Sequence, residues 1–250
     1  MAPSNPAMLV AAIDTSGKSG GISLAEGDGQ SFRIIESSAI AGGTFSAQLV
    51  PTLAALLHKH GLAPLDLDGF SAISGPGSFT GLRVGLSAIK GLAEVLKKPI
   101  ATVSLLEALA DVSGAQGAIG AALDAGREEI FFGLYERQVD AIEQRSERLL
   151  SRKELIDEIR LAHPMALVSS DGGVLSILRD AGLEALETKR PGSEEAARIG
   201  LRKLLRGETV SVETLDANYL RRSDAEIHFK STGSKPTEFK PTGVKPTERG

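Results

Sequence analysis

Runs of apolar residues separated by turn signals predict three successive strands at the start of the chain. The first run, residues 8–13, is continuously apolar and ends at Asp14, as expected for a buried strand that enters a turn. Residues 21–25 and 32–36 fit a second and a third strand, and residues 27–29 (Gly-Asp-Gly) are typical of a hairpin turn between them. The chain therefore begins with strands joined by short connections.

Apolar side chains at three- and four-residue spacing then predict helices that alternate with short apolar strands. Ser78 is a candidate N-cap for the second helix, and Pro99 prevents the continuation of that helix. Ser104 and Glu107 form a capping-box pattern at the start of the third helix. The predicted elements are helices at 45–60, 79–96 and 105–111, and strands at 69–74 and 100–103.

The order of these elements predicts an α/β fold of the ribonuclease-H-like or actin-like type, in which a mixed sheet is covered by helices. The order then begins again, because residues 10–26 align with residues 120–136 without a gap. The alignment places Asp14 on Asp124, each at the end of an apolar strand. Chance similarity between short apolar strands is the alternative to a duplication. A duplication predicts two facing domains of the same type.

The second half of the chain is less regular. Helices are expected at 151–161 and 193–206, and a strand at 166–170 leads into the turn sequence Asp-Gly-Gly. Near the C-terminus Lys-Pro-Thr recurs every five residues with almost no apolar content, so this segment cannot offset its ordering entropy by burial. The expected units are domains at 1–104 and 105–228, the last segment of the second returning to the first, and a disordered tail at 229–250.

Composition narrows the function classes. The 250 residues carry a net charge of −4, so no overall positive field attracts the protein to nucleic acid. The chain has no cysteine, which excludes disulfides, thiolate chemistry and Cys-ligated zinc. Its first residues lack the pattern of a signal peptide, and no apolar run is long enough to span a membrane. We therefore expect a cytoplasmic protein that has no membrane partner.

The loop that follows the first strand has the residue types of a phosphate-binding turn. Asp14, Thr15 and Ser16 lie where an actin-like ATPase places its first phosphate loop, and Asp124 occupies the matching place in the second half. Backbone N–H groups and hydroxyls at such a turn can hold phosphate oxygens. The same residues also make ordinary turns at strand ends. The sequence therefore allows either a nucleotide site or a vestigial turn.

The stretch from Ser74 to Gly85 is the most distinctive in the chain. Gly81, Gly85 and Ala88 recur at helical spacing, and two glycines within one turn of a helix need compensation that close helix packing can supply. The partner of this face is either another part of the chain or another protein, and we favour another protein. The predicted partner interface consists of Leu49, Leu53, Leu56, Phe79, Gly81, Val84, Gly85 and Ala88.

Other candidate chemistry is sparse. His58 and His60 are two positions apart on a helix, do not share a face and make a poor metal site. No arrangement of nucleophile, base and carboxylate can be singled out, so no catalytic residue is assigned. Arg83, Arg221 and Arg222 could contact RNA or acidic partners, with solvated surface positions as the alternative.

Four stretches of the chain resemble the TsaB family. They are residues 12–16 (Ala-Ile-Asp-Thr-Ser), 75–83 (Gly-Pro-Gly-Ser-Phe-Thr-Gly-Leu-Arg), 122–124 (Ala-Leu-Asp) and 219–221 (Tyr-Leu-Arg). The resemblance covers about residues 8–228, and the 75–83 stretch is its most specific part. The chain departs from the family pattern at Phe45 and Ala217, where the family often has His and Pro, and in the Lys-Pro-Thr tail.

This resemblance implies two actin-like domains and the role of a non-catalytic scaffold. TsaB proteins pair with TsaD, which transfers a threonylcarbamoyl group to the adenosine beside the anticodon of ANN-decoding tRNAs, and the complex also uses the ATPase TsaE. The helices that begin at Phe45 and Phe79 would form the heterodimer interface. Contact with tRNA would be indirect, through the complex. Whether the chain forms a homodimer when its partner is absent stays open.

The resemblance also implies that the chain has no cofactor of its own. TsaD has a His-x-Glu-Gly-His type metal motif, and the corresponding positions here are Leu105 and Leu109, which have no lone pair to offer a metal. Metal and ATP are therefore expected on the partner subunits, and a metalloprotease is disfavoured. The alternative function is a stand-alone actin-fold ATPase or small-molecule kinase, which the Asp14 and Asp124 loops permit.

Overall fold

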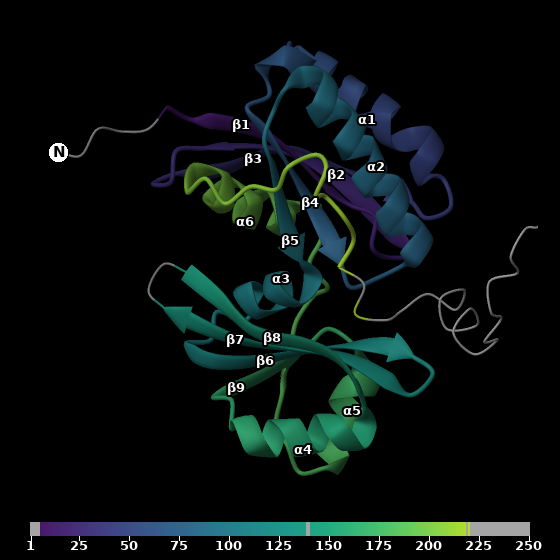
Figure 1. Ribbon diagram of the computed structural model, residues 1–250, viewed down its shortest axis with the longest axis vertical. Helices are drawn as coiled ribbons and strands as arrows, with labels where there is room; N and C mark the ends of the chain where they lie inside the picture. The colour runs from purple at the N-terminus through teal and green to yellow at the C-terminus, as the bar shows by residue number, and fades with distance from the viewer. Residues whose placement is uncertain (1–5, 139–140, 219, 221–250) are drawn as a thin grey trace, which may run out of the picture. The chain divides into compact units, whose positions relative to one another are not determined.

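Two five-stranded sheets organise the part of the chain that the structure describes, residues 6–138, 141–218 and 220 (Figure 1). The structure is a computed structural model. The first sheet contains β1 (Met8–Asp14), β2 (Ser19–Gly27), β3 (Phe32–Ala41), β4 (Gly69–Gly75) and β5 (Ile100–Ser104). The second sheet contains β6 (Gly117–Gly126), β7 (Glu129–Gln138), β8 (Ala141–Ser151), β9 (Ala166–Ser169) and β10 (Leu186–Glu187).

The two sheets have the same strand order. It is β3-β2-β1-β4-β5 in the first sheet and β8-β7-β6-β9-β10 in the second. In each sheet the first three strands form antiparallel hairpins, and the fourth strand lies parallel to the first. This arrangement confirms the predicted α/β class with mixed sheets, and the repeated order supports an internal duplication.

Helices cover both faces of the first sheet because β1 is apolar on both sides. Ala11 and Ile13 face α1 (Phe45–Lys59) and α2 (Phe79–Leu96) in one core cluster. Val10 and Ala12, which point the other way, pack with α6 (Ser193–Leu205) in a second cluster. The continuous apolar run that predicted β1 is therefore explained by burial on two sides.

The second sheet is also covered on both faces. Phe132 and Ala122 pack against α4 (Arg152–Ala162) and α5 (Gly172–Asp180). Ile119 and Tyr135 pack instead against α3 (Leu105–Val112), which follows the first sheet directly. Because α3 and α6 belong to one core cluster with residues of both sheets, the two halves of the fold share a core. Among the described residues, no helix is both long and apolar enough to cross a membrane.

Several local sequence signals are confirmed. The Ser78 hydroxyl accepts a 3.3 Å hydrogen bond from the Gly81 amide and caps α2. At the start of α3, Ser104 accepts from the Leu106 amide at 3.2 Å, and the Ser104 amide donates to Glu107 at 3.3 Å. The two reciprocal bonds satisfy backbone donors that a helix start would otherwise leave without partners.

The gapless alignment of the two halves needs one correction. Ile13 pairs with Ile22 in the first hairpin, so the alignment would pair Leu123 with Phe132 in the second. Leu123 is instead opposite Phe131, because the shorter connection between β6 and β7 and the register shift between Asp124 and Gly126 together change the pairing by one residue. The match holds along β6 and slips by one position in β7.

Strand β8 and helix α5 of the second half are missing from the sequence-based prediction. Strand β8 was not recognised because it is rich in charged and polar residues, and its stability comes from continuous pairing with β7 at the edge of the sheet. The Asp-Gly-Gly sequence predicted as a turn begins α5, with Asp171 as its N-cap residue. Glycine at a helix start is a weak helix signal, and tertiary packing against the sheet decides the outcome. The short elements η1 (Pro64–Asp66) and β10 were also missed, and the tail assigned to 229–250 lies outside the described residues.

The approach of α6 to the first sheet depends on small residues. The Ser71 hydroxyl on β4 donates a 2.7 Å hydrogen bond to the Ala196 carbonyl. A Cβ atom added at Gly200 would lie 2.0 Å from the Ser71 Oγ and 2.4 Å from its Cβ. The helix can therefore reach the sheet only because position 200 carries no side chain.

We predict that Gly200→Ala destabilises the protein although alanine is the better helix former. The added methyl group would collide with Ser71 and push α6 off the sheet. Gly91→Ala on α2 is the matched control, because nothing lies within 4 Å of a Cβ at that position. We expect the control to stabilise the fold by roughly 0.5–1 kcal/mol. Urea unfolding of both variants checks this, and a Gly200→Ala variant as stable as the control would contradict it.

Candidate functional site

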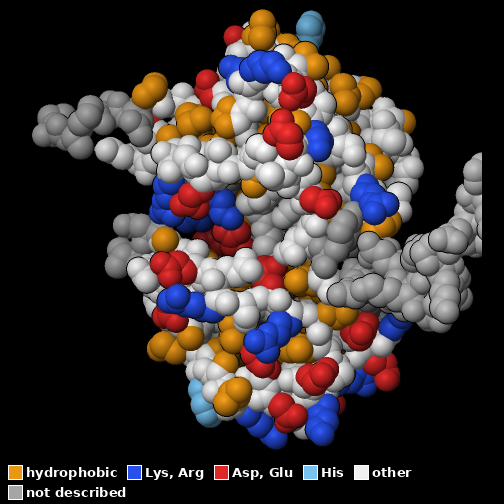
Figure 2. All heavy atoms as spheres, in the orientation of Figure 1, with side chains coloured by type: hydrophobic (Ala, Val, Ile, Leu, Met, Phe, Trp, Pro, Cys, Tyr) orange, Lys and Arg blue, Asp and Glu red, His pale blue; other side chains and the backbone are white. Residues whose placement is uncertain are grey.

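The outward faces of α1 and α2 form the candidate partner surface. A shallow groove between the helices is lined by Ser46 and Val50 of α1 and by Val84, Ser87 and Ala88 of α2, among others. Figure 2 shows hydrophobic side chains at the surface where Figure 1 places these two helices. Val50 is 47% exposed and contributes apolar area to this surface.

Three leucines of α1 that were predicted to face a partner point inward. Leu49, Leu53 and Leu56 are 1%, 4% and 5% exposed and belong to the core cluster beneath the helix. The helical spacing correctly identified an apolar face, but that face packs on the first sheet. This part of the predicted interface is corrected, because buried side chains cannot contact a second protein.

The glycines of α2 are also committed to internal packing. A Cβ at Gly81 would lie 2.1 Å from the Thr15 carbonyl oxygen, and one at Gly85 would lie 2.2 Å from the Thr15 hydroxyl oxygen. The partner of this glycine face is therefore the first loop of the same chain. Of the eight residues predicted at the interface, Phe79, Val84 and Ala88 remain accessible on the surface.

Arg83, which the sequence suggested as a possible contact for RNA or an acidic partner, makes a contact with Phe79 that the sequence did not reveal. Its guanidinium carbon lies 3.8 Å from the ring centroid of Phe79 in a cation–π arrangement. The pair covers the start of α2 next to the groove. The sequence signal for this cation–π contact is the spacing of Phe and Arg four positions apart on a helix.

The Asp14 loop is enclosed by other parts of the chain. Asp14, Thr15 and Ser16 are at most 4% exposed. The Asp14 Oδ1 atom accepts hydrogen bonds from the Ser16 amide at 2.8 Å and from the Ser16 hydroxyl at 2.6 Å. Ser78 donates its amide to the Ser16 carbonyl at 2.7 Å, and Arg190 donates to the Ser16 hydroxyl at 3.1 Å. The polar groups of this loop are thus occupied by the protein itself.

Burial raises the pKa of the Asp14 carboxyl above its usual value, although the hydrogen bonds from Ser16 and the charge of Arg190 lower it. The matching loop of the second sheet differs. Asp124 is exposed, its amide donates to Asp171 at 2.8 Å, and its Oδ1 accepts from the Gly126 amide at 3.0 Å. The two loops are equivalent in topology but not in environment.

The metal-ligand positions implied by the family resemblance are part of the core. Leu105 and Leu109 are 1% and 0% exposed and pack between α3 and the second sheet. Within residues 6–138, 141–218 and 220, no group of three or more His, Asp or Glu side chains is arranged to hold a metal ion. The chemistry of the described residues at these two positions is purely aliphatic.

The fold defines a two-lobed α/β protein of the actin-like class. A solved structure from Pseudomonas aeruginosa, an uncharacterized protein with similarity to peptidase YEAZ, has a TM-score of 0.67 and covers 86% of this chain and 100% of its own, at 24% identity. The family model of TsaD, tRNA N6-adenosine threonylcarbamoyltransferase, matches residues 36–157.

Relatives of known sequence identify the family within this class. The tRNA threonylcarbamoyladenosine biosynthesis protein TsaB of Bacillus subtilis is 32% identical over 88% of this chain and 96% of its own length. The Escherichia coli protein of the same name is 28% identical over 71% of this chain and 81% of its own length. The chain belongs to the TsaB family, as the sequence motifs predicted.

We predict that Asp14→Asn alters the pH dependence of stability. The native carboxyl has a raised pKa, so the native state binds the proton more tightly than the unfolded state, whose carboxyl pKa is about 3.9. The wild-type free energy of unfolding should therefore fall as pH rises from about 3.9 through the raised native value. Asparagine removes this contribution, so the free energy of unfolding of the variant should rise relative to that of the wild type across that pH interval. Urea unfolding at a series of pH values measures the difference, and parallel curves would contradict the expectation.

Proposed function

We propose that this chain is a non-catalytic subunit of the machinery that makes threonylcarbamoyladenosine in tRNA, and that it pairs with a TsaD-type catalytic subunit. The observation that carries the proposal is the identity with proteins named for this biosynthesis along almost the whole chain. The family model that matches residues 36–157 is that of the threonylcarbamoyltransferase itself. A chain and a partner that share a fold can pair through equivalent surfaces in a pseudo-two-fold arrangement.

The groove between α1 and α2 is the surface that we assign to this pairing. It lies inside the region that matches the TsaD model, so a TsaD-type partner would present an equivalent pair of helices. Ser87, Ala88 and Gly91 are small residues on the outward side of α2, which favours close approach of a second helix. Val50 and Val84 supply apolar area that pairing would remove from water.

The absence of catalysis is supported by the residues of the two candidate sites. Leu105 and Leu109 offer a metal no ligand, and the Asp14 loop is filled by contacts from α2 and Arg190. Because the halves of the fold share one core, opening and closing of a cleft between them is disfavoured. We therefore assign ATP and metal to partner subunits, including a TsaE-type ATPase, in the cytoplasm. A stand-alone actin-fold ATPase or kinase is the weaker alternative.

Depletion of this protein should abolish threonylcarbamoyladenosine in tRNA. Mass spectrometry of digested tRNA measures the nucleoside, and a tagged copy of the chain should recover the TsaD-type subunit. Unchanged modification without a recovered partner would overturn the proposal and favour the ATPase or kinase, which magnesium-dependent ATP binding by the isolated chain would support.

Val50→Asp should weaken pairing with the TsaD-type subunit by roughly a hundred-fold, because pairing would bury an uncompensated charge. Position 50 is exposed, so the fold should persist. Leu161→Asp is the matched control, an exposed leucine on α4 at 79% exposure and away from the groove. Calorimetric titration of both variants against the purified partner checks this, and equal affinities would place the interface elsewhere.

The structure also shows why Gly85 is unsuitable for such a test. A side chain there would strike Thr15 inside the protein, so a bulky substitution would perturb the fold and the partner surface together. The Val50 and Leu161 pair avoids this ambiguity, because both side chains are already at the surface.

A further inference from the structure

Side chains from α3, β7 and α6 meet at the carboxylate of Asp111, whose side chain is only 2% exposed. The Nη2 atoms of Arg198 and Arg202 lie 2.9 Å and 3.0 Å from its Oδ2 atom. The Nη1 atom of Arg137 lies 3.4 Å from Oδ1. One buried carboxylate therefore faces three guanidinium groups.

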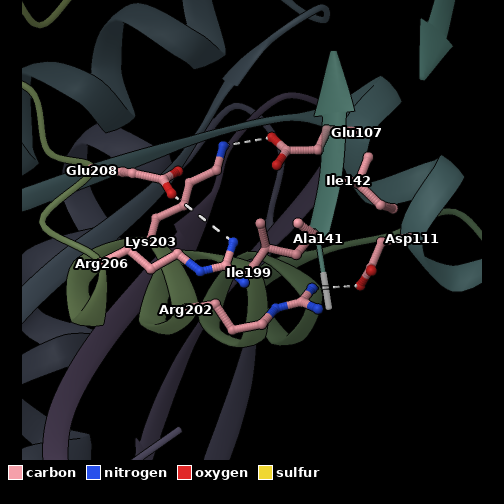
Figure 3. A pocket seen from close by; sticks show the side chains of 9 residues that line it. All are labelled: Glu107, Asp111, Ala141, Ile142, Ile199, Arg202, Lys203, Arg206 and Glu208. Carbon is pink, nitrogen blue, oxygen red and sulfur yellow. Dashed lines mark hydrogen bonds and ion pairs between the residues drawn. The ribbon is translucent and has the colours of Figure 1, made fainter. Parts of the chain in front are cut away.

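A second ion pair adjoins this group in a narrow pocket (Figure 3). Lys203 Nζ lies 2.7 Å from the Glu107 carboxylate, and Arg206 lies 3.9 Å from Glu208 at the pocket rim. If Arg206 and Glu208 are taken as a neutral pair, four cations face two carboxylates among the described residues. We call the four cations the α6 basic cluster: Arg137, Arg198, Arg202 and Lys203.

This excess of two positive charges is confined to the cluster and contrasts with the net charge of −4 on the whole chain. It also opposes helix stability, since Arg198 and Arg202 stand four positions apart on α6 and like charges at this spacing repel. A buried carboxylate can be satisfied by one bidentate arginine. Three guanidiniums around Asp111 therefore exceed what the carboxylate itself requires.

The guanidiniums keep donors available for a ligand. Arg198 and Arg202 side chains are 39% and 36% exposed, and each contacts Asp111 through a single nitrogen. Because a guanidinium carries five N–H donors, most of these donors have no protein acceptor among the described residues. Figure 2 shows Lys and Arg side chains mixed with Asp and Glu at the surface between the two sheets. Along α6 the arginines are spaced by about 6 Å, four residues at 1.5 Å each.

We propose that the α6 basic cluster binds phosphate groups of an RNA backbone, with Arg198 and Arg202 contacting successive phosphates. Planar guanidinium groups recognise phosphate oxygens through paired hydrogen bonds. The proposal rests on the proposed function, which makes tRNA the substrate of the complex. It adds a direct contact from this chain, although the overall negative charge limits the number of such contacts.

The test is binding of a labelled, unmodified tRNA transcript to the full chain, followed by fluorescence anisotropy from low to physiological salt. Arg198→Gln combined with Arg202→Gln should weaken binding roughly tenfold, and the slope of log affinity against log salt should fall by about one to two. A matched control is Arg145→Gln with Arg152→Gln, which removes the same charge from exposed positions on β8 and α4.

Asp111→Asn separates ligand binding from a purely structural ion cluster. It removes a negative charge from beside the guanidiniums, so tRNA should bind more tightly than to the wild type. If the cluster only joins α3 to α6, this variant and the arginine variant should both unfold at a lower temperature than the wild type. Their affinities for tRNA should then be unchanged. Arg202→Gln alone serves if the double variant does not fold.

Absence of tRNA binding by the wild type at low salt would overturn the inference, as would equal affinities of the cluster and control variants. The proposed function has its own readout in tRNA modification. If modification depends on the chain but tRNA binding does not depend on the cluster, the function stands and the inference falls. If tRNA binding depends on the cluster but modification does not depend on the chain, the inference stands and the proposed function falls. The chain would then be an RNA-binding protein with a role outside this biosynthesis.

Discussion

The close seating of α6 on the first sheet is the constraint on which the rest of the structure depends. The helix follows the second sheet in the chain but packs across β1, β2 and β4 of the first, where Ser71 bonds to its backbone and Gly200 leaves room for the contact. Together with α3 it completes a core cluster that contains residues of both sheets. The two halves are thereby joined twice, once by α3 and once by the returning helix.

The end of the described chain adds a further connection. Asn218 donates its amide to the Ser74 carbonyl on β4 at 2.7 Å and its side-chain nitrogen to Glu147 on β8 at 2.5 Å. Glu147 also accepts from the buried Tyr135 hydroxyl. Gly75 is required here, because its φ of +136° and the nearby Asn218 carbonyl exclude a side chain. These contacts attach the end of the described chain to both sheets.

The internal contacts of α2 decide which surface is left for a partner. Its glycines hold the Asp14 loop against the first sheet, so the side of the helix with the most unusual sequence faces inward. The outward side carries Val84, Ser87, Ala88 and Gly91, a plainer set of residues. A distinctive motif on a helix can therefore serve packing inside the chain and not the surface that we propose for a partner.

The sequence by itself determined the element order of the first half, the caps at Ser78 and Ser104 and the repeated strand that ends in Asp14 and Asp124, because these depend on local periodicity and side-chain hydrogen bonds. It also placed the chain in its family. Only the tertiary structure decided that Leu49, Leu53 and Leu56 are core residues, that β8 pairs along β7, and that Asp111 gathers three arginines from distant segments. An apolar helical stripe looks the same whether it covers a sheet or a second protein, and contacts between distant residues leave no local pattern.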